Sequence, residues 1–302
     1  MRGLIQLLSA IALVATVAAR GAAQSPQRAA DVPRALAEAR AAIGGDKQLA
    51  KVRGLSLAGT LQRMIGDRTI DGDITIDLQL PDKMLHTDSI SPMGDSALIV
   101  TTDGLNGDSL LRGSRVVNAP PGAMIRVPPP PAAGSEAEAQ ALRAARADLA
   151  RLTVALLLTA PASMPLEFAG GGEAESSEGQ ADVIDIKGAG SFAAKLFLDK
   201  SSHRPLMLTY RGVAPRMSLR RVQGPPPAGG RGPAGEPAPD RAGSAPEIVD
   251  ITLFFDDYRP EDGVTLPHHI TRAIGGQTNE ELTFKTIKIN PAFKAETFAI
   301  RN

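Results

Sequence analysis

The segment Ile70–Leu80, which reads IDGDITIDLQL, decides the fold class of this chain. Apolar side chains at positions 70, 74, 76, 78 and 80 share one phase, and three aspartates and a glutamine fall in the other phase. Successive side chains of a β-strand point to opposite faces, so the segment predicts a strand with one dry face and one wet face. Such alternation is typical of an antiparallel sheet that packs one face on a core.

The same two-residue period recurs on both sides of this segment. Upstream, alternate positions of the stretch that begins at Gly54 carry leucines. Downstream, Asp103-Gly104 predicts a hairpin turn between two strands. The strands predicted after Leu80 cover 83–90, 97–102, 105–111, 164–168, 183–187, 192–199, 205–210, 248–258, 264–272 and 282–289.

Helices are predicted before the first strand and between the two runs of strands. Asp31 is typical of a helix N-cap, Gly44-Gly45 ends that helix, and a short second helix is predicted over 46–51. In the middle of the chain, Ser135 is the predicted N-cap of a longer helix. Four leucines of that helix, at spacings of seven, three and four, form one stripe, and its end over 154–158 is apolar nearly all round.

This order of elements favours one large sheet. Sequential strands mostly pair with their neighbours, and a sheet of roughly eleven strands must curl or close. Its apolar face then lines a concavity that only the helices are available to cover. We therefore expect a mainly β (α+β) fold: a large curled antiparallel sheet or unclosed β-barrel with helices covering its concave face.

The N-terminal residues 1–23 have the order of a secretory signal peptide. Arg2 supplies a positive charge, residues 4–19 are uncharged and mostly apolar, and small residues precede Gln24. The apolar run is shorter than the ~20 residues that cross a bilayer, so cleavage is expected after Ala23, with Ala19 as the alternative. Residues 24–302 are then expected to form a single domain of an exported, periplasmic protein.

Two proline-rich segments interrupt the predicted strands. Residues 118–133 include four consecutive prolines and are expected to form an extended loop. Residues 214–246 are dense in proline, glycine and arginine and have little to bury. We expect them to be a disordered insertion between two strands.

The composition excludes several classes of partner. Lysine plus arginine and aspartate plus glutamate number 33 each, so no net field attracts nucleic acid or an anionic surface. The chain has no tryptophan and two tyrosines, which leaves little aromatic surface for stacking bases or sugars. It has no cysteine, hence no disulfide and no thiolate metal site. We expect no nucleic-acid partner and only transient contact with membranes.

The motifs that would carry chemistry are incomplete. His268 and His269 are adjacent in a predicted strand, so they point to opposite faces and do not chelate one ion. The aspartates of 71–77 lack the remaining ligands of a calcium loop, and the glycines at 188 and 190 precede a strand rather than a phosphate-binding helix. We predict no metal, no cofactor and no enzyme. The alternative is a hydrolase that uses His268 or His269 with a nearby carboxylate.

Several short motifs resemble the periplasmic lipoprotein-carrier superfamily, the LolA/LolB-like and outer-membrane lipoprotein-sorting proteins. They are AIGGDKQLAKVRGLSLAGTL at 42–61, ITIDLQLPDKML at 74–85, DGLNGDSLLRG at 103–113, LFLDKSSHRPLMLTY at 196–210, DYRPEDGVTLPHHI at 257–270 and IKINPAF at 287–293. The resemblance implies an unclosed antiparallel barrel whose helices cover a hydrophobic cavity for acyl chains. The arginine with which that carrier ties its lid has no matched position, although Arg53 and Arg63 lie near the corresponding strand.

We therefore expect a periplasmic binding or carrier protein for lipid or for the acyl chains of lipidated proteins. Inward-facing strand residues and the helix stripe are the predicted ligand contacts: Leu57, Leu61, Ile74, Ile76, Leu78, Leu149, Leu152, Leu156, Leu196 and Leu198. The alternative is an envelope sensor or assembly module that uses the same fold to bind a protein partner, with residues 214–246 as the contact.

Overall fold

The computed structural model describes residues 31–91, 97–118, 131–176, 179–214 and 247–299. Within them, twelve strands form one antiparallel sheet in the order β6-β5-β3-β2-β1-β13-β12-β11-β10-β9-β8-β7. The first run of strands is β1 (Gly54–Ile65), β2 (Arg68–Gln79), β3 (Lys83–Ile90), β5 (Leu98–Asn106) and β6 (Ser109–Val117). The second run is β7 (Leu166–Ser176), β8 (Gly179–Gly188), β9 (Ala193–Asp199), β10 (Pro205–Val213), β11 (Ile248–Glu261), β12 (Val264–Ile274) and β13 (Gln277–Ile289).

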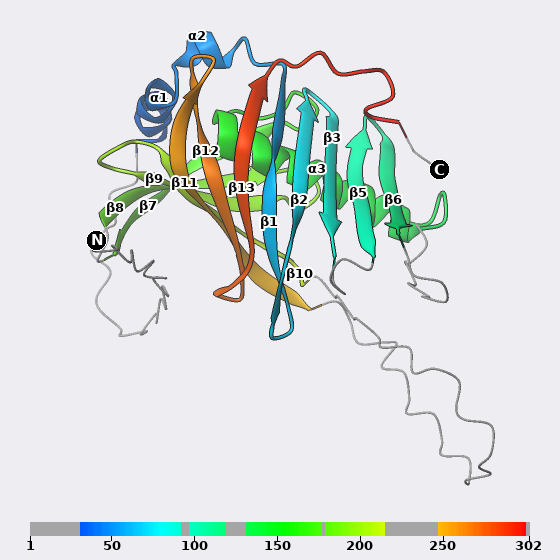
Figure 1. Cartoon of the computed structure of the whole chain (residues 1–302). Helices are drawn as coiled ribbons and strands as arrows, with labels where there is room; N and C mark the ends of the chain where they lie inside the picture. Colours follow the sequence, from blue (N-terminus) through cyan, green and yellow to red (C-terminus); the bar gives the residue numbers. More distant parts are fainter. Residues whose placement is uncertain (1–30, 92–96, 119–130, 177–178, 215–246, 300–302) are drawn as a thin grey trace, which may run out of the picture.

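The first and last strands of the chain join the two runs into one sheet. β1 pairs with β13 along most of its length, with Leu61 opposite Leu282, while β6 and β7 remain as the two edges. The sheet curls without closing, as the sequence predicted, and helix α3 (Glu136–Leu157) lies in its concave side (Figure 1). Its neighbours there are β5, β6 and β10.

The two N-terminal helices lie at one end of the curled sheet (Figure 1). Helix α1 (Val32–Ala42) begins as predicted, because the Asp31 carboxylate accepts a hydrogen bond from the Arg34 N–H. Helix α2 (Asp46–Leu49) follows directly. The C-terminal tail runs back across the same end, where Phe298 is buried and its ring meets that of Phe293 edge-on at 5.1 Å. This end of the half-barrel is therefore covered.

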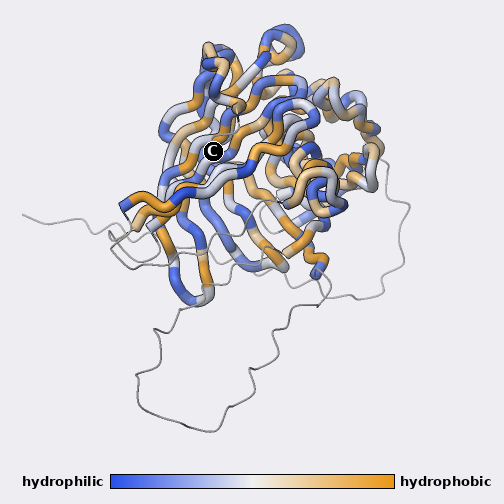
Figure 2. The backbone as a smooth tube through the Cα atoms, turned by 90° about the vertical axis from the view of Figure 1, so that its right-hand side faces the viewer, coloured by the Kyte–Doolittle hydropathy of each residue, from blue (hydrophilic) through white to orange (hydrophobic). Residues whose placement is uncertain are grey.

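The core lies between the concave face and α3. Apolar and polar residues alternate along the strands (Figure 2), and the inward phase of β2 is buried as its sequence predicted. On α3, Leu149 and every residue from Thr153 to Leu157 are buried. The hydroxyl of Thr153 donates to the Leu149 carbonyl, so this one polar side chain is satisfied within the helix. The apolar end of α3 is thus a packed part of the core.

Two predictions about the strands are wrong. Asp103-Gly104 is not a turn, because β5 runs through it to Asn106 and the hairpin turn is Gly107-Asp108. Gly104 instead permits close approach of β3, since a Cβ there would lie 2.0 Å from the Met84 carbonyl oxygen. The strands β7 and β8 also extend well beyond 164–168 and 183–187. β7 is a largely exposed edge strand, so no apolar alternation marked most of its length.

Three expectations fall wholly or mostly outside the described residues. They are the signal peptide at 1–23, the proline-rich loop at 118–133 and the insertion at 214–246. Within the described part of the chain, no helix has the length and hydropathy needed to span a bilayer.

Candidate binding site

A cavity of about 720 Å³ lies between the concave face of the sheet and helix α3. Pockets that hold small ligands usually measure ~300–1,000 Å³, so the volume suits a lipid-sized molecule. Much of its wall is aliphatic and comes from both the sheet and α3. The aliphatic lining includes Ile76, Met84, Leu110, Leu152, Ile270 and Leu282.

Charged and polar side chains form a second part of the wall, which we call the polar belt. It consists of Arg63, His86, Asp88, Asp103, Arg272 and Glu280, from β1, β3, β5, β12 and β13. Arg63 lies opposite Glu280, and Glu280 opposite Arg272, in the strand register close to the β1–β2 and β12–β13 turns, so these three residues lie towards the end of the half-barrel opposite α1 and α2. The cavity is therefore amphipathic, whereas the sequence had suggested a purely apolar one.

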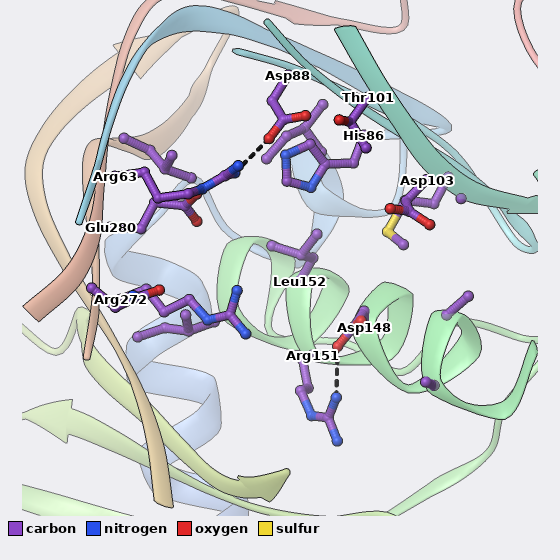
Figure 3. Close-up of a pocket in the computed structure, with 18 of the residues that line it drawn as sticks. Arg63, His86, Asp88, Thr101, Asp103, Asp148, Arg151, Leu152, Arg272 and Glu280 are labelled. Carbon is purple, nitrogen blue, oxygen red and sulfur yellow. Dashed lines mark hydrogen bonds and ion pairs between the residues drawn. The ribbon is translucent and has the colours of Figure 1, made fainter. Parts of the chain in front are cut away.

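Arg63 holds two carboxylates together within the polar belt (Figure 3). Its Nη2 lies 2.5 Å from Asp88 Oδ2 and 2.6 Å from Glu280 Oε1, and its Nε donates to the same Glu280 oxygen at 2.8 Å. Asp88 and Glu280 are buried. Burial by itself would lower the pKa of Arg63, but the charges of Glu280 and Asp88 outweigh it, and the pKa is raised. We call these three residues the buried ion triad.

Arg272 enters the cavity from β12, and its guanidinium ends between the ion triad and α3 (Figure 3). Four arginines line the cavity. Arg63, Arg112 and Arg151 each form an ion pair with a carboxylate, whereas Arg272 forms none among the described residues. It does interact with Tyr210: burial raises the pKa of the Tyr210 hydroxyl, and Asp148 adds to this, while Arg272 and Arg151 act in the opposite direction.

Arg151 separates this cavity from a second hollow. Its guanidinium carbon lies 3.8 Å from the centre of the Tyr210 ring, and its Nη1 lies 2.7 Å from Asp148 Oδ1. On the far side of this stack is a hollow of about 810 Å³ over β8 to β11, whose lining includes Lys187, Lys195 and again Arg151 and Tyr210. The stacked pair is therefore a wall shared by both spaces.

A second arginine fixes the position of α3. Arg40 of α1 donates from Nε and Nη2 to the carbonyl oxygen of Leu158, at 3.1 and 2.9 Å. Leu158 adopts a left-handed conformation and is fully buried, so this contact caps the end of α3. Neither Arg53 nor Arg63 makes it. A link between residues 118 positions apart leaves no mark in the local sequence pattern.

The ten predicted contact residues are placed together in one core, but most of them lie behind the cavity wall. Ile76 and Leu152 line the cavity. The other eight are buried in the core and absent from the lining: Leu57, Leu61, Ile74, Leu78, Leu149, Leu156, Leu196 and Leu198. Contact of any of the ten with a ligand stays a prediction.

Sequence reasoning missed the polar belt, although its signal is present. Arg63, Arg272 and Glu280 each occupy the inward phase of a strand, two residues from a buried Leu61, Ile270 or Leu282. A charge in the dry phase of a one-faced strand is unusual, because burial of an unpaired charge is costly. Such positions indicate either paired ions or a site, and here they surround a cavity.

The histidines proposed for a hydrolase lie elsewhere. His268 is buried in the sheet, with Nδ1 2.8 Å from the Phe284 carbonyl oxygen and Nε2 3.0 Å from Glu261 Oε1. The Phe284 carbonyl and the Glu261 carboxylate thus lie on the two sides of the ring, although Nε2 makes no hydrogen bond. His269 points to the opposite face, and neither residue lines the cavity. In the described residues, no group of three or more histidines or carboxylates could hold a metal ion.

Fold and site together define a class: an unclosed antiparallel half-barrel with a helix and an amphipathic cavity in its concave side. No family model matches the chain, and no curated protein does. Among solved structures, the chain is similar to a DUF1329 family protein from Desulfovibrio piger, with 8% identity, a TM-score of 0.45, and coverage of 88% of this chain and 96% of that one.

Two further solved structures have similar coverage. One is a putative outer membrane lipoprotein-sorting protein domain from Vibrio parahaemolyticus, with 11% identity, a TM-score of 0.42, and coverage of 89% and 96%. The other is a LolA superfamily protein from Nitrosomonas europaea, with 12% identity, a TM-score of 0.45, and coverage of 88% and 97%. Their names agree with the resemblance read from the sequence motifs. The function argued below rests on the cavity itself.

Proposed function

We propose that the protein is an exported, non-catalytic binding protein whose cavity holds an acyl chain of a lipid or of a lipidated protein. The observation that carries the proposal is the cavity of about 720 Å³ with aliphatic walls on both the sheet and α3. Apolar contact contributes ~0.8 kcal/mol per buried methylene, so one long chain supplies enough free energy for tight binding. Export to the periplasm is supported by the signal-peptide pattern of residues 1–23.

The proposed ligand lies along α3 rather than in place of it. The C-terminal half of the helix is buried and its end is capped by Arg40. Ala141, Ala144 and Leu152 line the cavity on the same helix. Small side chains there keep the space open, while Ile76 and Ile270 face it from the sheet. Release of the ligand would then need no unfolding of the core.

Filling the cavity is expected to abolish uptake. Ala144 is exposed and lines the cavity, so Ala144→Trp places an indole in that space without disturbing buried side chains. We expect the affinity for a fluorescent fatty acid, measured by titration, to fall at least about tenfold, a loss of ~1.4 kcal/mol. Ala137→Trp is the matched control, because Ala137 is an exposed residue of α3 outside the lining. Equal affinities of the two variants would contradict the proposed site.

A further inference from the structure

The charged groups of the cavity are not equivalent. Arg112 is paired with Asp103 at 2.6 Å and Arg151 with Asp148 at 2.7 Å, while Arg63 is shared by two carboxylates. Arg272 is the cavity arginine without a carboxylate partner in the described part of the chain. It projects into the same space that the aliphatic wall surrounds (Figure 3).

Some residues of the cavity lining contain a buried side-chain nitrogen without a hydrogen-bond partner. Five buried side-chain nitrogens of the described residues have no hydrogen-bond partner, and three of them belong to the cavity-lining residues His86, Arg151 and Arg272. Buried polar groups without hydrogen-bond partners are rare, because each has lost its hydrogen bonds to water without replacing them. A hydrogen bond to an acceptor would offset that cost. Two of the three are guanidinium Nε atoms, which only donate. Arg272, whose side chain interacts with the Tyr210 hydroxyl but with no described carboxylate, therefore brings a positive charge to the wall that a negatively charged, acceptor-rich group would complement.

We infer that the ligand is an anionic amphiphile whose carboxylate or phosphate group is held by Arg272 at the polar belt, with its chain against the aliphatic wall. The inference rests on the proposed function and adds the chemical class of the ligand. A guanidinium presents a planar fork of donors that matches two oxygens of one anionic group. Ile270 lies on the same face of β12 two residues away, so head and chain contacts are adjacent.

A purely structural role for Arg272 is the competing explanation. The buried ion triad carries one excess negative charge, because Arg63 is shared by Asp88 and Glu280. Arg272 lies opposite Glu280 in the sheet and would offset that charge at a distance. In that case removal of Arg272 would lower stability, but it would not change the affinity for an anionic ligand relative to a neutral one.

The test uses three probes that share one chain: dodecanoate, dodecyl phosphate and the uncharged dodecanol. Each displaces a fluorescent fatty acid from the delipidated full-length protein at pH 8. We expect the wild type to bind at least one of the two anions about tenfold more tightly than dodecanol, since a charge-assisted hydrogen bond contributes that much. The preferred anion identifies a carboxylate or a phosphate head. Arg272→Gln should lose this preference while its affinity for dodecanol stays unchanged, and Arg272→Lys should keep part of it.

Arg143→Gln is the matched control, because Arg143 is an exposed, paired arginine of α3 outside the cavity lining. It should leave the preference intact. A wild type that binds all three probes equally, or an Arg272→Gln protein that weakens all three alike, would overturn the inference while leaving the acyl site standing. Absence of binding for all three probes would instead contradict the proposed function. If Arg272→Gln fails to fold, the wild-type preference and Arg272→Lys still decide.

Discussion

Replacing Arg63 by methionine is expected to lower the free energy of unfolding by about 3–5 kcal/mol. The substitution keeps an apolar stem in the wall but removes the one group that pairs both Asp88 and Glu280. Asp88 and Glu280 would then be buried without the cation that pairs with both, which is far more costly than loss of an exposed ion pair. Urea unfolding, followed by circular dichroism, measures the difference.

Two controls separate this effect from a general effect of removing charge. Arg112→Met breaks the ion pair between Arg112 and Asp103. Both side chains are about half exposed, so the free energy of unfolding should fall by no more than about 1 kcal/mol. Replacing the whole triad, as Arg63→Met with Asp88→Leu and Glu280→Leu, should restore most of the stability, because neither buried carboxylate remains. An Arg63→Met protein as stable as the wild type would show that the triad is not an integral part of the fold.

Leu156→Ala is expected to cost about 2–5 kcal/mol of stability and to leave ligand affinity nearly unchanged. Leu156 is 1% exposed and lies in the core outside the cavity lining. Its truncation therefore leaves a void that the neighbouring helix and strands cannot fill. Thermal and urea unfolding give the stability, and the fluorescent fatty-acid titration gives the affinity.

Leu152→Ala, one turn earlier on α3, is expected to show the opposite pattern. Leu152 is only half-buried and lines the cavity, so its truncation should cost little stability and about 1 kcal/mol of binding free energy. Together, the Leu156→Ala and Leu152→Ala variants test whether the apolar end of α3 is part of the core or a movable lid. A Leu156→Ala protein with normal stability and impaired binding would mean that this end of the helix exchanges with the ligand.

The fold was predictable because its main determinant is local. The strand at Ile70–Leu80 alternates so regularly that its buried face follows from the sequence, and the Asp31 cap and the apolar end of α3 are equally local signals. The junction of β1 with β13 is different, since it joins residues more than 200 positions apart in the chain. Only the requirement that a large one-faced sheet must curl indicated that the runs would meet.

The candidate site was predictable only in part. Aliphatic inward positions such as Ile76 and Leu152 were identified, but periodicity alone cannot say which inward residues fill the core and which border a cavity. The ion triad joins Arg63 to Glu280 over 217 residues, and nothing within one sequence connects them. The one available clue was that Arg63 and Arg272 lie two residues from Leu61 and Ile270, in the apolar phase of their strands.

The most direct test of the central claim is native mass spectrometry of the full chain expressed with its own N-terminal segment and purified from the bacterial envelope. We predict a complex of one protein with one acyl-chain molecule, seen in the wild type and in Ala137→Trp but not in Ala144→Trp. Protein that is unliganded in every preparation, and that takes up no fluorescent fatty acid after delipidation, would contradict the account.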